Sequence, residues 1–261
     1  MSDVVFGIDF SGSKNAGDSI WLTQAESCEQ DWRIEKCLSA RDEAGRRRDL
    51  VYGWLIKMIN NIEPIAVGLD FTFGLPAWAL TAESWRARLD EVNDWDSPDA
   101  MRSHCLERLP EAGHDRRKTE SKHIGGLRGY GWLLKTQTYY GLTEFLPLLL
   151  EKTDAVVKPM DESNAPTMAI EVYPGATLAE LDLEREGYKQ ERASHYDTRE
   201  RNLDGLVGQG YHLDSEVRRN ALCNDDALDS VVAAVATARA VENDFAVEEE
   251  RYDPLEGYIY A

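Results

Sequence analysis

The sequence has few of the features that mark exported, membrane-spanning or zinc-binding proteins. Its four cysteines stand far apart and form no CxxC pair, so we expect free thiols and no zinc site. No apolar run approaches the roughly 18 residues that a membrane-spanning helix needs. The first residues, MSDVVFGID, contain neither a basic segment nor a cleavage site, which predicts a cytoplasmic protein.

Common motifs of nucleotide binding and hydrolysis are also missing. The chain contains no P-loop, GxGxxG, HExxH or GxSxG sequence, and its five histidines show no metal-ligand spacing. Any functional site must therefore be sought among other residue types.

Positive charge is scarce: 29 lysines and arginines stand against 48 aspartates and glutamates, which gives a net charge of −19. This balance fits an ordinary acidic cytosolic protein or one from a high-salt cytoplasm, and we favour the second. In about 1 M salt the Debye length is only about 3 Å, so the acidic surface would hardly repel itself. A charge of −19 ordinarily argues against nucleic acid as a partner; high salt weakens both that argument and the attraction to phosphate.

Each of two apolar stretches is followed directly by an aspartate. Residues 4–8 (VVFGI) predict a buried strand followed by Asp9 and a Gly/Ser turn, and residues 65–69 (IAVGL) predict another followed by Asp70. In parallel strands these acids would meet at one sheet edge, where open α/β sheets place their ligands. Asp9 could instead simply cap its turn.

Between these two strands the pattern predicts two more strands and a helix. Residues 18–23 and 32–38 alternate polar and apolar side chains, as antiparallel strands do, and residues 45–61 repeat apolar side chains at helical spacing. Residues 75–109 predict two or three short helices. Residues 133–150, 176–182 and 188–203 are also expected to be helical, and the last two segments are strongly charged and functionally uninformative.

A basic, glycine-rich loop lies at residues 114–135 and is the best local candidate for contacting phosphate groups. An equally plain interpretation is a surface loop whose cations pair with the acidic surface. Its cations are Arg116, Arg117, Lys118, Lys122, Arg128 and Lys135.

The second half adds three more acids to elements that are expected to be buried. Residues 167–173 (TMAIEVY) predict a strand that places Glu171 in or near the core. Residues 224–241 predict a largely buried helix with Asp226 and Asp229 on one side near its beginning. One acid there is routine because the helix dipole favours it, but two on a packed face are not. Residues 257–260 (GYIY) predict an edge strand.

Collected at one sheet edge, these carboxylates would repel one another unless cations lay between them. Hard oxygen ligands suit Mg²⁺ or Mn²⁺, and two such ions can activate water and stabilise the leaving oxygen of a phosphodiester. The residues therefore predict metal-dependent phosphoryl chemistry. The acids expected to act in it are Asp9, Asp70, Glu171, Asp226 and Asp229.

Five blocks occur in an order that resembles an uncharacterised domain-of-unknown-function family of predicted ribonuclease H-like nucleases. They are GIDFSGSK, GLDFTFGLP, RRKTE, AIEVYPGA and DDALDSVVAAVATA, and they span nearly the whole chain. The resemblance implies one α/β domain over residues 1–261, with a mixed sheet of three antiparallel and then parallel strands flanked by helices, and a helical insertion at about 75–131. It also implies that Asp9, Asp70, Asp226 and Asp229 form an acidic metal site.

The expected function is hydrolysis of nucleic acid, DNA or RNA, by a two-metal site in which Asp9 bridges the ions. Ser11, Lys14, Arg116, Arg117, Lys122 and Arg128 would position the substrate. Two alternatives stay open: an actin-like or sugar-kinase-like ATPase that binds nucleotide phosphates at GIDFSGSK, and a non-catalytic binding protein of the same fold.

Overall fold

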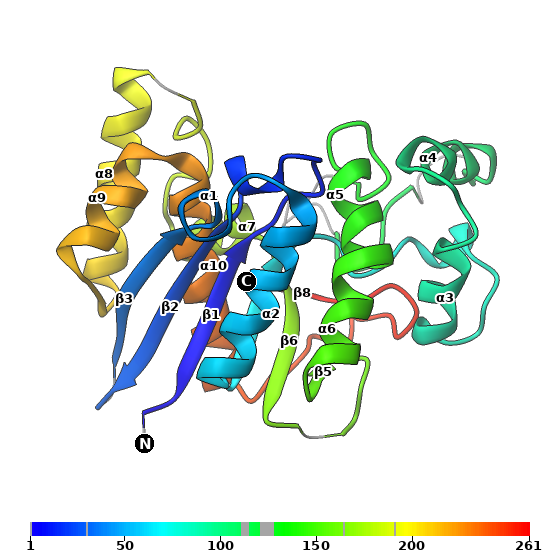
Figure 1. The fold of residues 1–261 in the computed structure, drawn as a ribbon, viewed down its shortest axis with the longest axis horizontal. Coiled ribbons are helices and arrows are strands. Elements are labelled where there is room, and N and C mark those ends of the chain that lie inside the picture. The colour runs from blue at the N-terminus through cyan, green and yellow to red at the C-terminus, as the bar shows by residue number, and fades with distance from the viewer. Residues whose placement is uncertain (1, 30, 111–114, 121–127, 164, 191) are drawn as a thin grey trace.

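The computed structural model describes residues 2–29, 31–110, 115–120, 128–163, 165–190 and 192–261. One mixed sheet forms the centre of the described structure (Figure 1). Its strands are β1 (Val4–Asp9), β2 (Trp21–Cys28), β3 (Asp31–Ser39), β4 (Ala66–Asp70), β5 (Ala155–Val157), β6 (Thr167–Val172), β7 (Tyr211–Leu213) and β8 (Ile259–Tyr260).

The strand order is β5-β6-β4-β1-β2-β3-β7. The hairpin-connected strands β1, β2 and β3 pair antiparallel, whereas β1, β4 and β6 pair in parallel. The remaining edge of β6 is shared, because β5 pairs with Thr167–Ala169 and β8 pairs with Glu171 and Val172. The parallel strands therefore end on the same side of the sheet.

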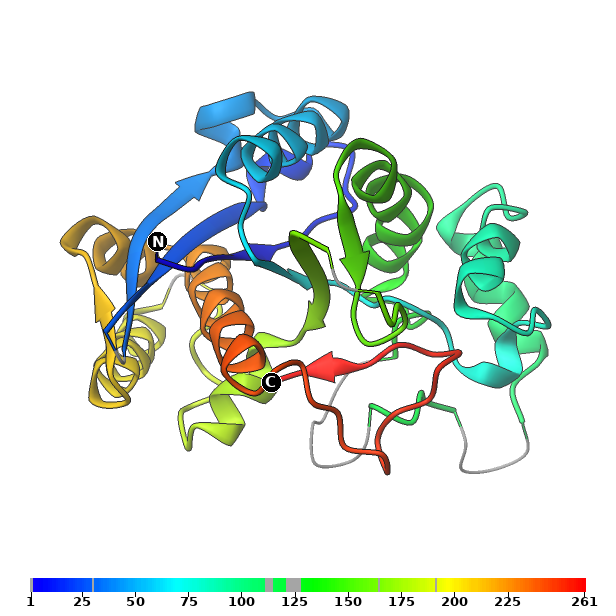
Figure 2. The same ribbon diagram turned by 90° about the horizontal axis from the view of Figure 1, so that it is seen from below.

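Helices cover both faces of this sheet (Figure 2). One face packs on α2 and α6, and the other on α10 together with α7, α8 and α9. The helical elements are η1 (Ala16–Asp18), α1 (Ala40–Ala44), α2 (Arg48–Ile62), η2 (Ala77–Ala79), α3 (Trp85–Val92), α4 (Pro98–Glu107), α5 (Lys135–Tyr140), η3 (Gly141–Phe145), α6 (Leu146–Lys152), α7 (Pro174–Glu180), α8 (Ala193–Gly208), α9 (Ser215–Cys223) and α10 (Asp225–Glu242).

The alternation of side chains along β1 explains why both faces are buried. Phe6 and Ile8 join the core beneath α2, and Val5 points to the opposite core beneath α10. All three are fully buried, as expected for a central strand with helices on both sides.

The expected fold class, an α/β fold with antiparallel and then parallel strands flanked by helices, is confirmed. The bounds of two elements differed most from the prediction. The strand expected at 18–23 begins only at Trp21, because Ala16–Asp18 form a 3₁₀ turn first, and the helix expected at 188–203 begins at Ala193. The pattern also missed β5, β7 and α9; the two strands have only three residues each, too few to show a period.

Close contact between α10 and the sheet depends on two glycines. Gly7 of β1 and Gly68 of β4 lie side by side in the parallel register. A Cβ atom on Gly7 would overlap the backbone of Ala233 and Ala234, and one on Gly68 would overlap the Thr237 hydroxyl. The helix backbone therefore lies directly on the glycines, which fixes its position along both strands.

We predict that Gly7→Ala lowers the free energy of unfolding by about 2 kcal/mol or more, because α10 must move away to admit the methyl group. Gly53→Ala is the matched control. Gly53 lies within α2 with open space around its Cβ position, so alanine there should be neutral or stabilising by up to about 1 kcal/mol. Urea denaturation of both variants measures the difference, and equal stability of the two would contradict this account of the contact.

Candidate functional site

Asp9 and Asp70 end neighbouring parallel strands. Each is the last residue of its strand, and the register places the two opposite one another. Both are partly buried, so their carboxylates lie at the carboxyl ends of these central strands and are only partly hydrated. The sequence prediction that these two acids meet is thus confirmed by the register.

The beginning of α10 brings two more aspartates to this edge. Asn224 caps the helix by accepting a hydrogen bond from the Ala227 N–H at 3.0 Å. Asp226 follows in the first turn, and Asp229 lies one turn later with only 2% of its surface exposed. Because α10 is held against β1 and β4 by the glycine contact, both carboxylates face the strand ends.

These four aspartates line one cavity of about 430 Å³. The same cavity reaches Glu171 on β6 and Ile259 on β8, so it follows the ends of β1, β4 and β6 and the beginning of β8. Its other polar lining residues include Ser11, Ser19, Thr72, Arg117, Glu120, Gln137, Thr138, Tyr173 and Lys189.

Burial and mutual repulsion make these carboxylates hard to ionise. Burial, together with the charge of Asp229, raises the pKa of Asp70 to about 8. Burial, with Asp225 and Asp229, raises the pKa of Asp226 to about 7. The pKa of Asp9 is also raised, chiefly by burial and then by its three aspartate neighbours. In the absence of a cation, the site therefore retains protons near neutral pH.

One lysine compensates part of the negative charge of these aspartates. The Lys189 ammonium lies 2.7 Å from Asp229 Oδ2, and the neighbouring Tyr188 hydroxyl donates to Asp229 Oδ1 at 2.7 Å. Burial lowers the pKa of Lys189, but the pull of Asp229, Asp70 and Asp9 outweighs burial and raises it overall. Both carboxylate oxygens of Asp229 are thus occupied by side chains of one short loop before α8.

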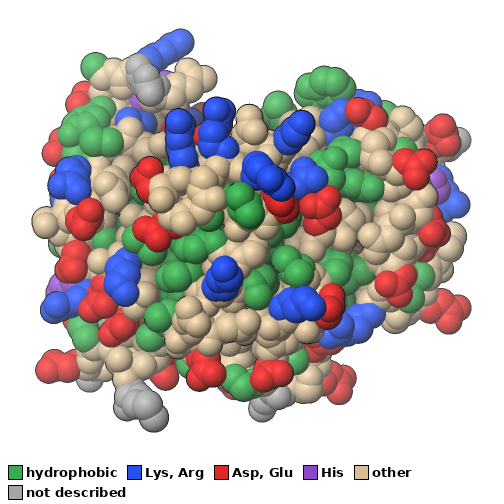
Figure 3. Space-filling model, in the orientation of Figure 1, with side chains coloured by type: hydrophobic (Ala, Val, Ile, Leu, Met, Phe, Trp, Pro, Cys, Tyr) green, Lys and Arg blue, Asp and Glu red, His purple; other side chains and the backbone are tan. Residues whose placement is uncertain are grey.

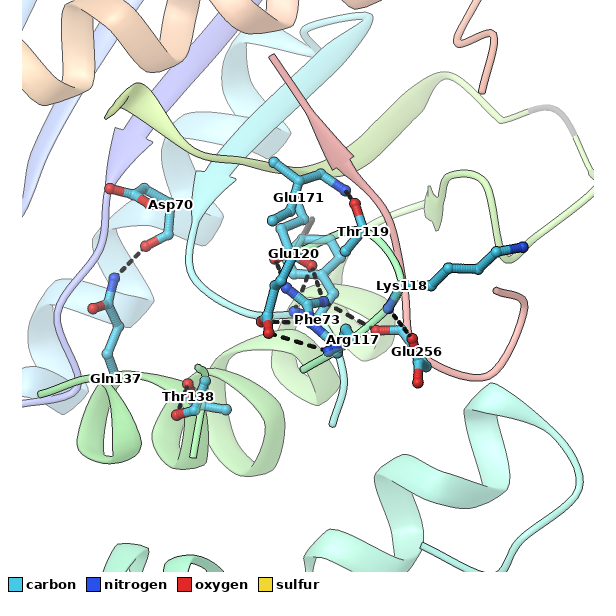
Figure 4. A network of polar contacts seen from close by, with 12 residues as sticks. Asp70, Phe73, Arg117, Lys118, Thr119, Glu120, Gln137, Thr138, Glu171 and Glu256 are labelled. Carbon is cyan, nitrogen blue, oxygen red and sulfur yellow. Dashed lines mark hydrogen bonds and ion pairs between the residues drawn. The ribbon is translucent and has the colours of Figure 1, made fainter. Parts of the chain in front are cut away.

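At the other end of the cavity, Arg117 forms a buried ion-pair network (Figure 4). Its guanidinium donates to both oxygens of Glu171, at 2.8 and 2.5 Å, and to Glu120 at 2.8 Å. Glu171 also accepts the Phe73 N–H at 2.9 Å, and Arg117 donates to the Glu256 carbonyl at 3.0 Å. Removing Arg117 would leave two buried carboxylates without their partner, so its place in this structure is architectural.

The same network ties distant segments to β6. The Glu256 carboxylate accepts the N–H groups of Ala77 and Lys118 at 2.6 and 2.5 Å. The Ile259 N–H donates to Thr119 Oγ1 at 2.9 Å, which holds β8 beside residues 115–120. Glu171 is therefore brought to the predicted site, where it shares the Arg117 guanidinium with Glu120.

The residues predicted to position substrate are not all brought together. Ser11 lines the cavity, Lys14 and Arg116 are exposed, and Arg117 is enclosed by Glu120 and Glu171. Arg128 lies 3.0 Å from Asp115 and lines a different cavity. Lys122 lies outside the described residues.

Sequence reasoning missed Tyr188, Lys189 and Gln137. The first two lie in a loop that was expected to be helical, and no spacing relates residue 189 to Asp229. Gln137 of α5 donates through its side-chain amide to the Asp70 carbonyl. Only Gly187, which adopts a positive φ of 76°, could have indicated a turn before them.

Residues 141–251 match a family described as "Protein of unknown function (DUF429)", which supports the expected resemblance to an uncharacterised family over that segment. The matched segment contains Glu171, Lys189 and the beginning of α10, and it leaves out β1 and β4. No curated protein and no solved structure matches the chain. Among the described residues, no helix is both long and apolar enough to cross a membrane.

The raised pKa values predict that this site destabilises the fold as pH rises. Between the ordinary aspartate value of 3.8 and the folded-state value of about 8 for Asp70, the folded chain holds protons that the unfolded chain has released. The state that binds more protons is favoured at low pH, so the penalty is absent below pH 3.8 and complete above pH 8.

We therefore expect Asp70→Asn to flatten the fall in unfolding free energy between pH 4 and 8, because the amide does not ionise. Urea denaturation in 1 M NaCl, which suppresses repulsion among surface acids, measures this slope for both proteins. Identical slopes for the wild type and the variant would show that Asp70 does not titrate in this range.

Proposed function

We propose that this protein is a divalent-cation-dependent hydrolase of phosphodiester bonds, with nucleic acid as its substrate. The observation that carries the proposal is the convergence of Asp9, Asp70, Asp226 and Asp229, from two strands and one helix, on a single cavity. Structural carboxylates normally receive a cation or several N–H donors, and three of these four do not have an ion-pair partner among the described residues.

The donor set fits Mg²⁺ or Mn²⁺. All four side chains offer hard carboxylate oxygens. Their raised pKa values reflect burial and negative charge that the described protein groups compensate only in part. Among the described residues, two cationic side chains line the cavity: Arg117 pairs with Glu120 and Glu171, and Lys189 contacts Asp229. As they stand, no three described His, Cys, Asp or Glu side chains converge closely enough to hold a metal ion, so binding requires rotation of these carboxylates.

When bound, a divalent ion would supply a Lewis acid for activating water against a phosphodiester. Residues of the chain would hold this ion and form hydrogen bonds to the substrate. Asp9 and Asp70 would hold the ion at the strand ends, with Asp226 completing its shell. The Ser11 and Thr72 side chains would offer hydrogen bonds to phosphate oxygens at the cavity wall.

The connectivity supports a ribonuclease H-like fold. Strands β3, β2 and β1 are antiparallel, α2 follows, and β4 then pairs in parallel with β1. The acids follow the same order as in the resemblance, at the ends of β1 and β4 and at the beginning of the late helix α10. This likeness concerns architecture, and the acidic cavity is what connects the architecture to chemistry.

A surface beside the cavity suits nucleic acid. Trp132 and Leu133 are 69% and 75% exposed, and Lys135 Nζ lies 4.0 Å from the Trp132 ring centroid. Arg102 approaches the same ring at 5.7 Å. Leu134 lines both the cavity beneath Trp132 and the carboxylate cavity, so one extended ligand could contact both. An exposed indole flanked by cations is a stacking platform for nucleobases.

Lysine and arginine side chains also gather beside the strand ends, over α1, the beginning of α2 and the adjoining part of α5 (Figure 3). In α1 and the turn before α2, Arg41, Arg46 and Arg47 are 60%, 55% and 71% exposed at the side chain, and they pair with Asp18 and Asp49. Because the chain carries a net charge of −19, this local gathering gives a phosphate backbone one favourable approach.

Asp9→Asn should abolish Mn²⁺ binding in calorimetry and Mn²⁺-dependent cleavage of oligonucleotides, because it removes the carboxylate that faces the other three. The fold should persist, since the amide fits the same space and carries no buried charge. The control is Asp197→Asn on α8, an exposed aspartate that should behave as wild type. Full activity of the Asp9 variant would refute the proposed site.

Trp132→Ala should weaken binding of a labelled single-stranded oligonucleotide by about 5- to 100-fold, the loss of about one stacked base. Fluorescence anisotropy without divalent ions measures binding separately from cleavage. Trp132→Phe should retain most affinity, and Tyr196→Ala, which removes a 40% exposed aromatic ring on α8, is the control. Unchanged affinity in Trp132→Ala would exclude this surface while leaving the metal site untouched.

A further inference from the structure

Lys189 holds an unusual position in the carboxylate cavity. Its side chain is 61% exposed, so the stem crosses open space before the ammonium reaches Asp229, whose side chain is 2% exposed. The lysine lies on the loop between α7 and α8, outside the sheet and outside α10. An exposed stem with its charge held on a buried carboxylate differs from an ordinary surface ion pair.

Each carboxylate oxygen of Asp229 already has one partner on the loop before α8. Oδ2 meets the Lys189 ammonium at 2.7 Å, and Oδ1 accepts the Tyr188 hydroxyl at 2.7 Å. The ammonium also acts electrostatically on Asp9, Asp70 and Asp226, so a single positive charge serves the whole cluster. A divalent ion at Asp229 Oδ2 would lie directly beside this ammonium, and the two like charges would repel one another.

We propose that Lys189 is a built-in cation of this site, so that the folded chain binds one divalent ion, at Asp9 and Asp70, and excludes a second ion from Asp229. This inference rests on the proposed function and replaces the two-ion site expected from the sequence with one ion and one ammonium. An ammonium carries half the charge of a divalent ion and donates hydrogen bonds without coordination geometry. It stabilises negative charge at Asp229 while the strand-end aspartates remain available.

Removal of the lysine should free this position without unfolding the chain. Asp229 would keep the Tyr188 hydrogen bond, and the remainder of Lys189 is mostly exposed. In Lys189→Met, the carboxylate released from the ammonium becomes a ligand. In Lys189→Arg, a cation of the same charge stays at Asp229.

The test is the stoichiometry of Mn²⁺ binding, measured by calorimetry and by electron paramagnetic resonance of free Mn²⁺ in 1 M NaCl at pH 8. We expect one ion per chain for the wild type and for Lys189→Arg, and two for Lys189→Met. Lys152→Met is the matched control, because Lys152 is 52% exposed and pairs with Glu151 on the surface. It should bind one ion, and thermal melting checks that every variant is folded.

The possible failures are distinguishable. Two ions bound by the wild type, or one ion bound by Lys189→Met, would overturn the role of Lys189 and leave the metal-dependent function intact. The absence of Mn²⁺ binding in both proteins would overturn this inference and the proposed function together.

Discussion

The contact between α10 and the two central parallel strands is the constraint on which the site depends. Gly7 and Gly68 have no side chains to hold the helix away, so the backbone at Ala234 lies against the sheet. With the helix fixed there, its first two turns must end beside the strand termini, which places Asp229 next to Asp9. The acidic cavity is therefore a result of backbone packing, and carboxylates that repel one another are kept together by apolar burial on both sides of the sheet.

The two ends of the cavity treat charge differently. At the β6 end, Arg117 pairs with both Glu120 and Glu171 and also donates to the Glu256 carbonyl, just before β8. At the β1 and β4 ends, three aspartates have no equivalent partner among the described residues, and one lysine from a loop reaches the fourth. The first arrangement ties distant segments of the chain to β6, whereas the second is the part of the site at which we propose that a cation binds. A binding site needs both parts, because the Arg117 network holds the shape of the cavity around the unpaired aspartates.

The sequence predicted those parts of the site that depend on local pattern. Asp9 and Asp70 could be placed because each follows a short β-branched run, and Asp229 because it interrupts an otherwise apolar helix. Partners that come from distant parts of the chain could not be predicted this way: Arg117 lies 54 residues from Glu171, and Lys189 lies in a loop with no periodicity. Arg117 shows the limit clearly, since a basic residue in a glycine-rich segment predicts an exposed phosphate contact, and burial gave it a structural role.

The hydrogen bond from Gln137 to the Asp70 carbonyl has a thermodynamic consequence. Gln137 lies on α5, directly after the segment that carries Trp132, and it holds the backbone of an aspartate at the end of β4. A ligand that shifts α5 must therefore also change the position of that carboxylate. Any effect of such a ligand on cation affinity would be matched by an equal effect of the cation on ligand affinity, because linked equilibria are reciprocal. The two surfaces would then act as one energetic unit, joined through a single amide side chain.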